Sequence, residues 1–370
     1  MNADAHKKLH IGIITFHRAI NYGAILQAYA LQHVVEKMGC DCNVIDYRNK
    51  VLESKHKKVR LRDCRNPLDM ARFIFYSGHN NRKYDKFRDF LNTHIKMSST
   101  CNSTEDLQRI APQYDRFICG SDQVWNHRIT NFDKNYFLDF CNNPVKKNSY
   151  AASFGFSSLS NEYVEKYQLL LKGFNKIAVR ESQGKEIIRK LIGKNVDVVL
   201  DPTMLLDGAD WAKIACEYRT KNYILVYAFG RTSETMKIFI EKLAFQTKCS
   251  VVYISPTIYK QVKATYEKCI GPAEFLGLFK NAKYVVTNSF HGTAFALIFN
   301  KNFFLEMLPE SQGVNSRLEN ILNVFELHAR QIINGDNAHI LKAINYNNVN
   351  MILETERQKA LEYLQQIVHY

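Results

Sequence analysis

Residues 283–299 read KYVVTNSFHGTAFALIF, and this stretch decides the fold class. Its first part, Lys283 to Thr287, is a β-branched run of strand length, whereas Gly292 to Phe299 is apolar and compatible with a helix. Residues 288–292 therefore form a strand-to-helix turn. In open α/β sheets, ligands bind at such turns, outside the carboxyl ends of the strands. The stretch predicts a parallel α/β fold and places a histidine at its ligand-binding edge.

His291 lies in this turn, at the expected start of the helix. Backbone N–H groups at a helix N-terminus attract anions, and Ser289 and Thr293 add hydroxyls beside them. The partial positive charge there also lowers the proton affinity of a histidine, which suits a proton donor. A histidine that only closes the turn by bonding to the backbone is the alternative. We take His291 as a candidate catalytic residue, and Ser289 and Gly292 as candidate substrate-binding residues.

The composition is that of an ordinary globular protein, with 370 residues, 46% hydrophobic and 23% charged. This length exceeds a comfortable single core, so we expect two domains. The nine cysteines include no Cys-x-x-Cys pair, which indicates reduced thiols in a cytoplasmic protein. The polar amino terminus lacks a signal core, and no apolar run has the length of a membrane span. We expect a cytoplasmic protein.

Positive charge is concentrated in one region. The formal net charge is +14, and residues 55–65, KHKKVRLRDCR, are rich in Lys and Arg. Such a cluster suits nucleic acid, an anionic membrane face or a diphosphate-bearing substrate, and a solvated basic loop is the alternative. Nucleic acid is not favoured, because no helix-turn-helix, zinc-finger or RNP-type pattern is present to read bases. We expect no nucleic acid partner, and we keep peripheral contact with the inner membrane face as an expectation.

Strands and helices alternate along the chain, which implies parallel sheets covered by helices on both faces. After a strand at residues 9–16, apolar residues recur at spacings of three and four from Ala24 to Met38, as on one face of a helix. The other expected strands span residues 43–47, 115–119, 148–153, 176–179, 196–200, 223–229, 250–254, 283–287 and 303–306.

The chain is expected to form two Rossmann-like, doubly wound α/β domains. A polar link at residues 219–222 precedes a fresh strand and helix series, which suggests a domain boundary nearby. We assign residues 1–215, with a basic insertion around 51–103, to the first domain and residues 216–340 to the second. Residues 341–370 are rich in helix formers and are expected to pack as a helix across a domain surface.

Further polar turns follow other expected strands, at residues 17–23, 120–126, 153–155 and 180–182. If the strands are parallel, all these turns gather at one sheet edge. Their candidate substrate-binding side chains are Asn21, Tyr22, Gly23, Ser121, Gln123, Ser153 and Arg180, and Asp122 is a candidate catalytic residue. The structural alternatives are that Asp122 caps a helix and that Arg180 pairs with Glu181 or another surface acid. One shared cleft explains the four turns better than four coincidences.

The ordered set of these segments resembles one known family. It comprises NYGA at 21–24, LQAYAL at 26–31, GSDQVW at 120–125, YAASFG at 150–155, VRE at 179–181, DPT at 201–203 and SFHG at 289–292. Together they look like the polysaccharide pyruvyl transferase family, over about residues 11 to 320. The resemblance implies two Rossmann-like domains in a glycosyltransferase B-type arrangement, with phosphoenolpyruvate as the donor. It also implies a sugar or lipid-linked oligosaccharide acceptor, in capsule, exopolysaccharide or cell-wall glycan assembly.

The chemistry of ketal formation sets its own requirements. The methylene carbon of phosphoenolpyruvate must be protonated, hydroxyls must attack the cationic centre, and phosphate must leave. Arg180 and Arg317 are the expected anion clamps, because a guanidinium binds carboxylate or phosphate through two N–H groups. His291 is the expected general acid, as the family motif implies, and Asp122 is the residue expected to orient or deprotonate the acceptor.

No metal or cofactor is expected, because arginines and helix termini can carry the charge and no His, Asp and Glu cluster has metal-ligand spacing. Two other functions stay open. One is a glycosyltransferase that uses a nucleotide sugar in the same cleft, and the other is a noncatalytic binder of an anionic glycan or lipid surface. The transferase interpretation depends on distant segments meeting in one positively polarised crevice that includes His291 and Arg180.

Overall fold

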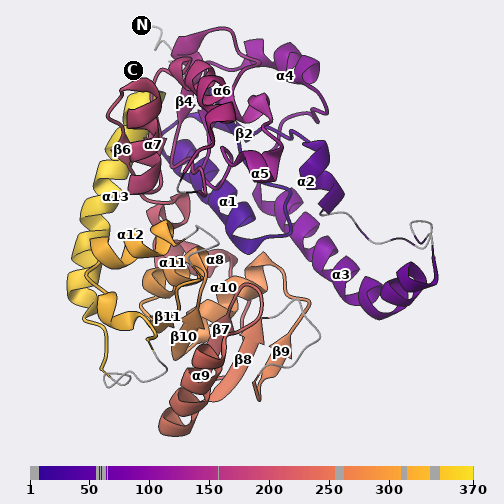
Figure 1. The fold of residues 1–370 in the computed structure, drawn as a ribbon, viewed down its shortest axis with the longest axis vertical. Helices are drawn as coiled ribbons and strands as arrows, with labels where there is room; N and C mark the ends of the chain where they lie inside the picture. The colour runs from indigo at the N-terminus through magenta and orange to yellow at the C-terminus, as the bar shows by residue number, and fades with distance from the viewer. Residues whose placement is uncertain are drawn as a thin grey trace, which may run out of the picture. The chain divides into compact units, whose positions relative to one another are not determined.

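The computed structural model describes residues 8–55, 58, 60, 64, 66–156, 158–254, 262–309, 315–333 and 342–369. Internal contacts divide the chain into two compact units. Figure 1 colours the chain by residue number, from indigo at the N-terminus to yellow at the C-terminus. Unit 1 comprises Met1–His56, Leu91–Leu205 and Thr355–Tyr370, and unit 2 comprises Lys57–Phe90 and Leu206–Glu354. Each unit contains a parallel sheet.

The main sheet of unit 1 has four parallel strands in the order β2-β1-β3-β4. They are β1 (His10–Ile14), β2 (Asp41–Val44), β3 (Arg116–Cys119) and β4 (Lys147–Ser149). Isolated bridges from β4 and from Ala152 connect this sheet to a two-stranded one, β5 (Ala178–Val179) and β6 (Asp197–Val198). Residues 11–14 of β1 are all buried, as expected for a parallel strand that is covered on both faces.

The helices of unit 1 flank these strands (Figure 1). They are α1 (Tyr22–Lys37), α2 (Lys50–Lys55), α4 (Thr104–Ile110), α5 (His127–Thr130), α6 (Asn161–Lys172) and α7 (Ser182–Ile192). The first helix, α1, is buried over most of its length and packs against the 3-10 helix η5 (Pro202–Leu205). This contact brings the segment after β6 next to the segment after β1.

Unit 2 contains a five-stranded parallel sheet in the order β11-β10-β7-β8-β9. The strands are β7 (Tyr223–Tyr227), β8 (Ser250–Ile254), β9 (Thr265–Glu267), β10 (Tyr284–Thr287) and β11 (Asn302–Leu305). The helices are α8 (Gly208–Ile214), α9 (Glu234–Thr247), α10 (Pro272–Asn281), α11 (Phe290–Ile298) and α12 (Ser316–Val324), with most of α3 (Pro67–His94). The central strands β7 and β10 are almost entirely buried, so their carboxyl ends are fixed by a packed core.

The strands predicted from the sequence all have counterparts in the structure, and most are shorter than expected. The three-residue strand β9 was not predicted, because its sequence Thr-Tyr-Glu has no apolar run and it lies at the edge of the sheet. The long helix α3 takes up much of the expected basic insertion, residues 51–103.

The boundaries of the two units fall at other residues than the expected domain boundaries. The larger segment of unit 2 begins at Leu206, and residues 57–90 of the expected insertion belong to the same unit. One reason is that the Lys86 ammonium on α3 pairs with the Glu274 carboxylate on α10. The terminal helix α13 (Tyr346–Val368) divides between the units after Glu354.

The basic cluster at residues 55–65 is described only in part. Lys57, Arg62 and Arg65 lie outside the described residues. Lys58 pairs with the Asp85 carboxylate at 2.5 Å, and Arg60 is exposed. Contact of this cluster with a membrane or an acceptor stays a prediction. Within the described ranges, no helix combines the length and the apolar character needed to cross a bilayer.

Gly277 sets how closely two segments of unit 2 approach, and it gives a test of the fold. A Cβ at this position would lie 1.9 Å from the Cys216 carbonyl oxygen, just after α8. Gly277→Ala should lower the free energy of unfolding by about 1–3 kcal/mol, because α10 must move away from that backbone. Chemical denaturation measures the change.

Gly78→Ala is the matched control for this prediction. Nothing lies within 4 Å of a Cβ at Gly78 in α3, so alanine should stabilise this helix by about 0.5–1 kcal/mol. Wild-type stability of the Gly277→Ala variant would contradict the close approach of α10 to Cys216.

Candidate active site

The turn between β10 and α11 is held by hydrogen bonds from side chains to the backbone. The Thr287 hydroxyl donates to the Tyr227 carbonyl oxygen at 2.6 Å and accepts from the Ser289 backbone N–H at 3.0 Å. Ser289 is the N-cap of α11, and its hydroxyl accepts from the Gly292 N–H at 3.3 Å. The predicted strand-to-helix turn is therefore confirmed, and it is tied to the ends of β7 and β10.

Asn288 joins the same turn to the segment that follows β7. Its side-chain oxygen accepts from the Phe229 N–H at 2.7 Å, and its side-chain nitrogen donates to the Phe229 carbonyl oxygen at 3.1 Å. Both backbone groups of Phe229 are thus satisfied where the ladder of the sheet ends. The two strand ends form one rigid platform.

Gly292 allows α11 to begin directly against this platform. A Cβ at Gly292 would lie 2.3 Å from the Thr287 hydroxyl oxygen and 3.1 Å from a ring carbon of Tyr227. The motif glycine therefore has a packing requirement that is independent of any ligand. Its predicted contact with substrate stays a prediction.

His291 is the second residue of α11, and only 6% of its surface is exposed. It lies in the first helical turn, where the N–H groups of the helix create a partial positive charge. Its ring meets the Phe290 ring edge to face, with 5.1 Å between centroids. The structure confirms the predicted position of His291 at a helix start, and its role in proton transfer stays a prediction.

Arg317 also lies at a helix start in unit 2. It is the second residue of α12, which contacts α11, and it is partly buried. The preceding Asn315 accepts from the Leu308 N–H at 3.0 Å and donates to the Leu308 carbonyl oxygen at 2.7 Å. These bonds fix the start of α12 close to the segment after β11. The predicted use of Arg317 as an anion clamp stays a prediction.

Asp122 ends the segment after β3 in a strained backbone conformation. Its φ of 75° is in the left-handed region, which costs most non-glycine residues about 1–2 kcal/mol and is tolerated best by Asp and Asn. Its carbonyl oxygen accepts from Val124 and Ser153, and its carboxylate accepts from the Gln123 N–H at 2.9 Å. The strain is held by the surrounding bonds, as is common at functional sites.

Arg180 lies at the centre of a buried charge cluster in unit 1. Its side chain is 1% exposed, and Nη1 donates to the Asp201 carboxylate at 2.9 Å. Asp122 lies 3.7 Å from Nη2, and Glu181 lies 3.8 Å from Nε. The guanidinium therefore connects the segments that follow β3, β5 and β6. The alternative that Arg180 pairs with acids is what the structure shows, although the principal partner is the buried Asp201.

The carboxylates keep this arginine charged in spite of its burial. Burial alone would lower the pKa of Arg180, but Asp201, Asp122 and Glu181 together raise it above its ordinary value. The described residues contain no group of three His, Cys, Asp or Glu side chains placed to hold a metal ion, and here the carboxylates surround a guanidinium. The predicted contact of Arg180 with an anionic donor stays a prediction.

Asp201 is the residue that sequence reasoning left without a role. Its Oδ2 accepts from the Ser121 hydroxyl at 2.7 Å, and its Oδ1 accepts from the Thr203 hydroxyl at 2.8 Å and the Thr203 N–H at 3.0 Å. The signal was present as the Asp-Pro-Thr motif, but nothing in the sequence paired it with Ser121 or Arg180. The Ser153 hydroxyl makes a similar bond to Glu181, at 2.8 Å.

The predicted turn after β1 is present and is tied to the same cluster. Asn21 is the N-cap of α1, and its side chain accepts from the Ala24 N–H at 3.2 Å, while Tyr22 and Gly23 are buried in the first turn. Gln27 on α1 donates to the Thr15 hydroxyl at 2.8 Å, which donates to the Ser121 carbonyl oxygen at 2.9 Å.

The structure therefore groups the predicted residues within each unit. In unit 1 it brings together Ser121, Asp122, Gln123, Ser153 and Arg180, with Asn21, Tyr22 and Gly23 on the adjoining helix. In unit 2 it groups Ser289, His291 and Gly292 on one turn, with Arg317 on a helix that contacts it. That the two groups serve one crevice stays a prediction.

Solved structures identify the fold class. The UDP-GlcNAc 2-epimerase of Neisseria meningitidis, solved with UDP-GlcNAc, is 11% identical to this chain, with a TM-score of 0.52 and coverage of 97% of this chain and 99% of its own. The UDP-GlcNAc 2-epimerase of Methanocaldococcus jannaschii is 14% identical, with a TM-score of 0.50 and coverage of 98% and 99%. Both are similar in fold alone. The fold is the two-domain glycosyltransferase B type, as predicted.

A family model gives the more specific assignment. The model described as polysaccharide pyruvyl transferase matches residues 21–305, which include every motif quoted for the resemblance. No curated protein sequence matches the chain. The protein belongs to the polysaccharide pyruvyl transferase family, and the sequence-based recognition is confirmed.

Gly155 gives a test of the loop that carries Asp122 and Gln123. Its φ is 65°, and a Cβ there would lie 1.9 Å from the Gln123 side-chain oxygen. Gly155→Ala should destabilise the protein by more than the roughly 1–2 kcal/mol that left-handed strain alone costs. Adding Gln123→Ala should remove the clash and recover the excess, which a denaturation double-mutant cycle measures.

Gly193→Ala separates strain from clash in this experiment. Gly193 also has a left-handed φ, of 69°, but nothing lies within 4 Å of its Cβ position. If Gly155→Ala costs no more than Gly193→Ala, the Gln123 side chain does not pack against Gly155 as described.

The buried charge cluster predicts a large effect at Asp201. Asp201→Asn should lower the free energy of unfolding by about 3–5 kcal/mol, because it leaves Arg180 buried beside a neutral partner. Glu186→Gln is the matched control, since Glu186 pairs with Arg189 at 2.8 Å on the exposed face of α7 and should have no measurable effect. Equal stability of the two variants would show that the Arg180 cluster does not hold unit 1 together.

Proposed function

We propose that this protein transfers the pyruvyl group of phosphoenolpyruvate to two hydroxyls of one sugar residue, as a step in surface polysaccharide synthesis. The observation that carries this proposal is the family match over residues 21–305, which covers the unit 1 group and the turn with Ser289, His291 and Gly292, whereas Arg317 lies beyond it. The acceptor is a sugar or a lipid-linked oligosaccharide. Contact with the inner membrane face, through the basic surplus, belongs to the same proposal.

The proposed reaction balances without a further reactant. A proton adds to the methylene carbon of phosphoenolpyruvate, and the first sugar hydroxyl, losing its proton, bonds to the adjacent carbon. The bond from that carbon to the phosphate oxygen breaks, and phosphate leaves with one proton. The second hydroxyl then closes the ketal ring and loses its proton. The enzyme must therefore provide a proton donor, a proton acceptor and countercharge for phosphate and carboxylate.

Unit 2 supplies the groups suited to the donor in this proposal. His291 is the proton donor to the methylene carbon. The N-terminus of α11 and the guanidinium of Arg317 provide positive charge for phosphate and carboxylate. In support, the side-chain bonds that fix this turn, from Thr287, Asn288 and Ser289, are all neutral.

Unit 1 supplies the groups suited to the acceptor. Around Arg180 lie three carboxylates, of Asp122, Glu181 and Asp201, so the cluster carries more negative than positive charge when all are ionised. Such a site disfavours a second anion and favours hydroxyl donors. Asp122 is the proposed base or orienting group. In place of the contact with the donor that was predicted from the sequence, Arg180 is proposed to position Asp122.

A direct assay separates this function from the two alternatives. The purified chain is incubated with phosphoenolpyruvate or with UDP-sugars, in the presence of soluble oligosaccharides and a lipid-linked oligosaccharide. Phosphate release with a ketal on the acceptor supports the proposal. Addition of a sugar from a UDP-sugar indicates a glycosyltransferase, and no product with any donor indicates a binding protein.

The proposed acid gives the sharpest single-residue prediction. His291→Ala should reduce phosphate release from phosphoenolpyruvate by at least about 10²-fold, the lower range for loss of a general acid, while the circular dichroism spectrum is unchanged. His328→Ala removes an exposed histidine of the same unit and should leave the rate unaltered. A His291→Ala enzyme with the wild-type rate would remove His291 from the mechanism.

A further inference from the structure

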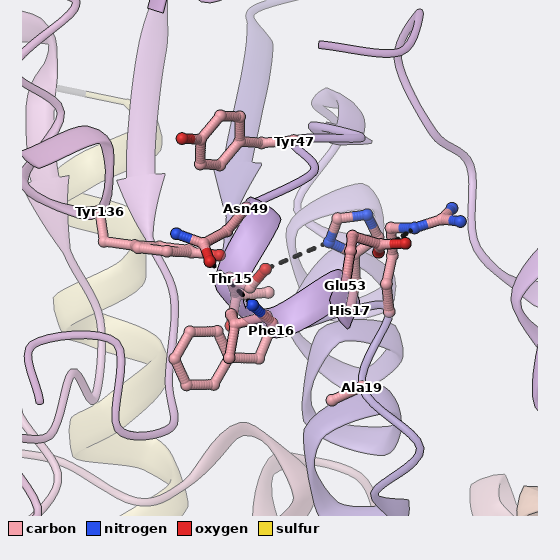
Figure 2. Close-up of a pocket in the computed structure, with 10 residues that line it drawn as sticks. Thr15, Phe16, His17, Ala19, Tyr47, Asn49, Glu53 and Tyr136 are labelled. Carbon is pink, nitrogen blue, oxygen red and sulfur yellow. Dashed lines mark hydrogen bonds and ion pairs between the residues drawn. The ribbon is translucent and has the colours of Figure 1, made fainter. Parts of the chain in front are cut away.

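A small pocket lies in unit 1 beside the carboxyl end of β1, and the motif residues do not line it. Figure 2 shows it between the segment after β1, the segment after β2, helix α2 and the ring of Tyr136. Its volume is about 20 Å³, which is room for one water-sized group. It is lined by Thr15, Phe16, His17, Arg18, Ala19, Tyr47, Asn49, Leu52, Glu53 and Tyr136.

Aromatic rings form one wall of this pocket. The Tyr136 ring meets Phe16 at 5.2 Å and Tyr47 at 5.9 Å, both edge to face. The Tyr47 hydroxyl donates to Asp133 at 2.7 Å, and burial followed by this carboxylate raises the pKa of Tyr47. The wall is therefore uncharged, and it offers apolar ring surface of the kind that carbon-bound hydrogens pack against.

A charged pair forms the opposite side, as Figure 2 shows for Glu53. Arg18 Nε donates to Glu53 Oε1 at 2.7 Å, and Arg18 Nη1 donates to Asp46 at 3.2 Å. About a third of the Glu53 side chain is exposed, so its carboxylate is reachable. A carboxylate accepts hydrogen bonds and a guanidinium donates them, and a hydroxyl group is the ligand that can do both at once.

The charges around the pocket do not favour an anion. Three carboxylates surround it, those of Glu53, Asp46 and Asp133. The basic residues around the pocket are Arg18, Arg48 and His17. The two ring nitrogens of His17 face the Thr15 carbonyl oxygen at 3.1 Å and Asp46 at 3.2 Å. Even when His17 is counted as a cation, positive charge does not outnumber negative charge. A neutral polar ligand fits this balance best.

We propose that this pocket binds one hydroxyl group of a carbohydrate, with the hydroxyl beside the Glu53–Arg18 pair and its carbon at the mouth of the pocket, against the aromatic wall. The inference rests on the proposed function in so far as the carbohydrate is the acceptor. It adds Glu53 and Arg18 as acceptor-specificity residues that the family motifs do not include. The pocket has room for the hydroxyl of a group such as an exocyclic hydroxymethyl and excludes a whole ring.

Binding of simple glycosides to the full chain tests the proposal. The probes are the methyl glycosides of glucose, galactose, mannose and N-acetylglucosamine, each with its 6-deoxy counterpart, followed by saturation-transfer NMR. At least one glycoside should bind, with the strongest transfer to its hydroxymethyl protons, and its 6-deoxy counterpart should bind more weakly. Glu53→Ala should weaken binding at least tenfold, and Glu53→Gln, which keeps an acceptor oxygen, should weaken it less.

Two further variants keep this test decisive. Glu186→Ala breaks an exposed Glu–Arg pair on α7 and should leave glycoside binding unchanged. Ala19→Leu adds three carbon atoms to a residue that lines the pocket and keeps both Arg18 and Glu53, so it should abolish binding even if Glu53→Ala proves unstable. The proposal is overturned if no glycoside binds the wild-type chain, if these variants bind as wild type does, or if phosphate or acetate competes for the pocket.

Measuring the binding of phosphoenolpyruvate separates a failure of the pocket proposal from a failure of the proposed function. Protection of the protein by phosphoenolpyruvate alone, measured as a shift in melting temperature, should be the same in wild type and Glu53→Ala. If glycosides bind at Glu53 and phosphoenolpyruvate does not bind at all, the proposal of pyruvyl transfer is contradicted and the proposal of a hydroxyl pocket is supported. If phosphoenolpyruvate protects both proteins and glycoside binding is the same in wild type and Glu53→Ala, the pocket proposal is contradicted and the proposal of pyruvyl transfer is unaffected.

Discussion

The charge cluster around Arg180 is the interaction on which the geometry of unit 1 depends. A guanidinium that is 1% exposed is costly to bury, and only well-placed carboxylates offset that cost. The partners come from the segments after β3 and β6 and from the residue next to Arg180 itself. Since each partner belongs to a different strand end, the cluster can form only when these ends lie side by side. It therefore makes the edge of the sheet, and the strained Asp122 on it, a cooperative unit.

Unit 2 joins the ends of β7 and β10 through neutral hydrogen bonds. Thr287 and Asn288 make these bonds. Helix α11 can begin directly against them because Gly292 has no side chain. The partial charge of the α11 N-terminus is consequently not cancelled by a nearby acid among these bonds. This difference gives the two units opposite electrostatic character at corresponding strand ends, one rich in carboxylates and one polarised positively by a helix.

The sequence predicted the parts of this architecture that are encoded locally. β-branched runs marked the strands, and polar breaks marked the turns, so His291 and Asp122 were placed correctly from their neighbours in the chain. Glu181 was named from the sequence as an alternative partner of Arg180, and it does lie beside the guanidinium. Asp201 and Asp122 could not be predicted as partners, because they are distant in sequence and only the folded sheet brings them to Arg180. The edge strand β9 was missed for a related reason, since its three residues carry no periodic signal.

Side-chain pairing also changes how the turn after β1 is interpreted. From the sequence, residues 17–23 were expected to form a polar turn with substrate-binding side chains at the start of a helix. In the structure, Asp46 accepts from His17, Arg18 and Arg48. Burial alone would raise the pKa of Asp46, but the bonds from His17, Arg48 and the Thr100 hydroxyl hold it far below its ordinary value. The basic side chains of this turn are therefore matched by an ionised carboxylate.

A turn neutralised in this way is suited to a hydroxyl and not to a phosphate. The Arg180 cluster, on the same sheet edge, has the same preference because its carboxylates outnumber its one guanidinium. Two independent sets of contacts thus favour a neutral acceptor at unit 1. An anionic donor needs the positive end of a helix, and the start of α11 offers one without a competing acid in the bonds that fix it. The chemistry of each substrate then follows from which strand ends keep their carboxylates.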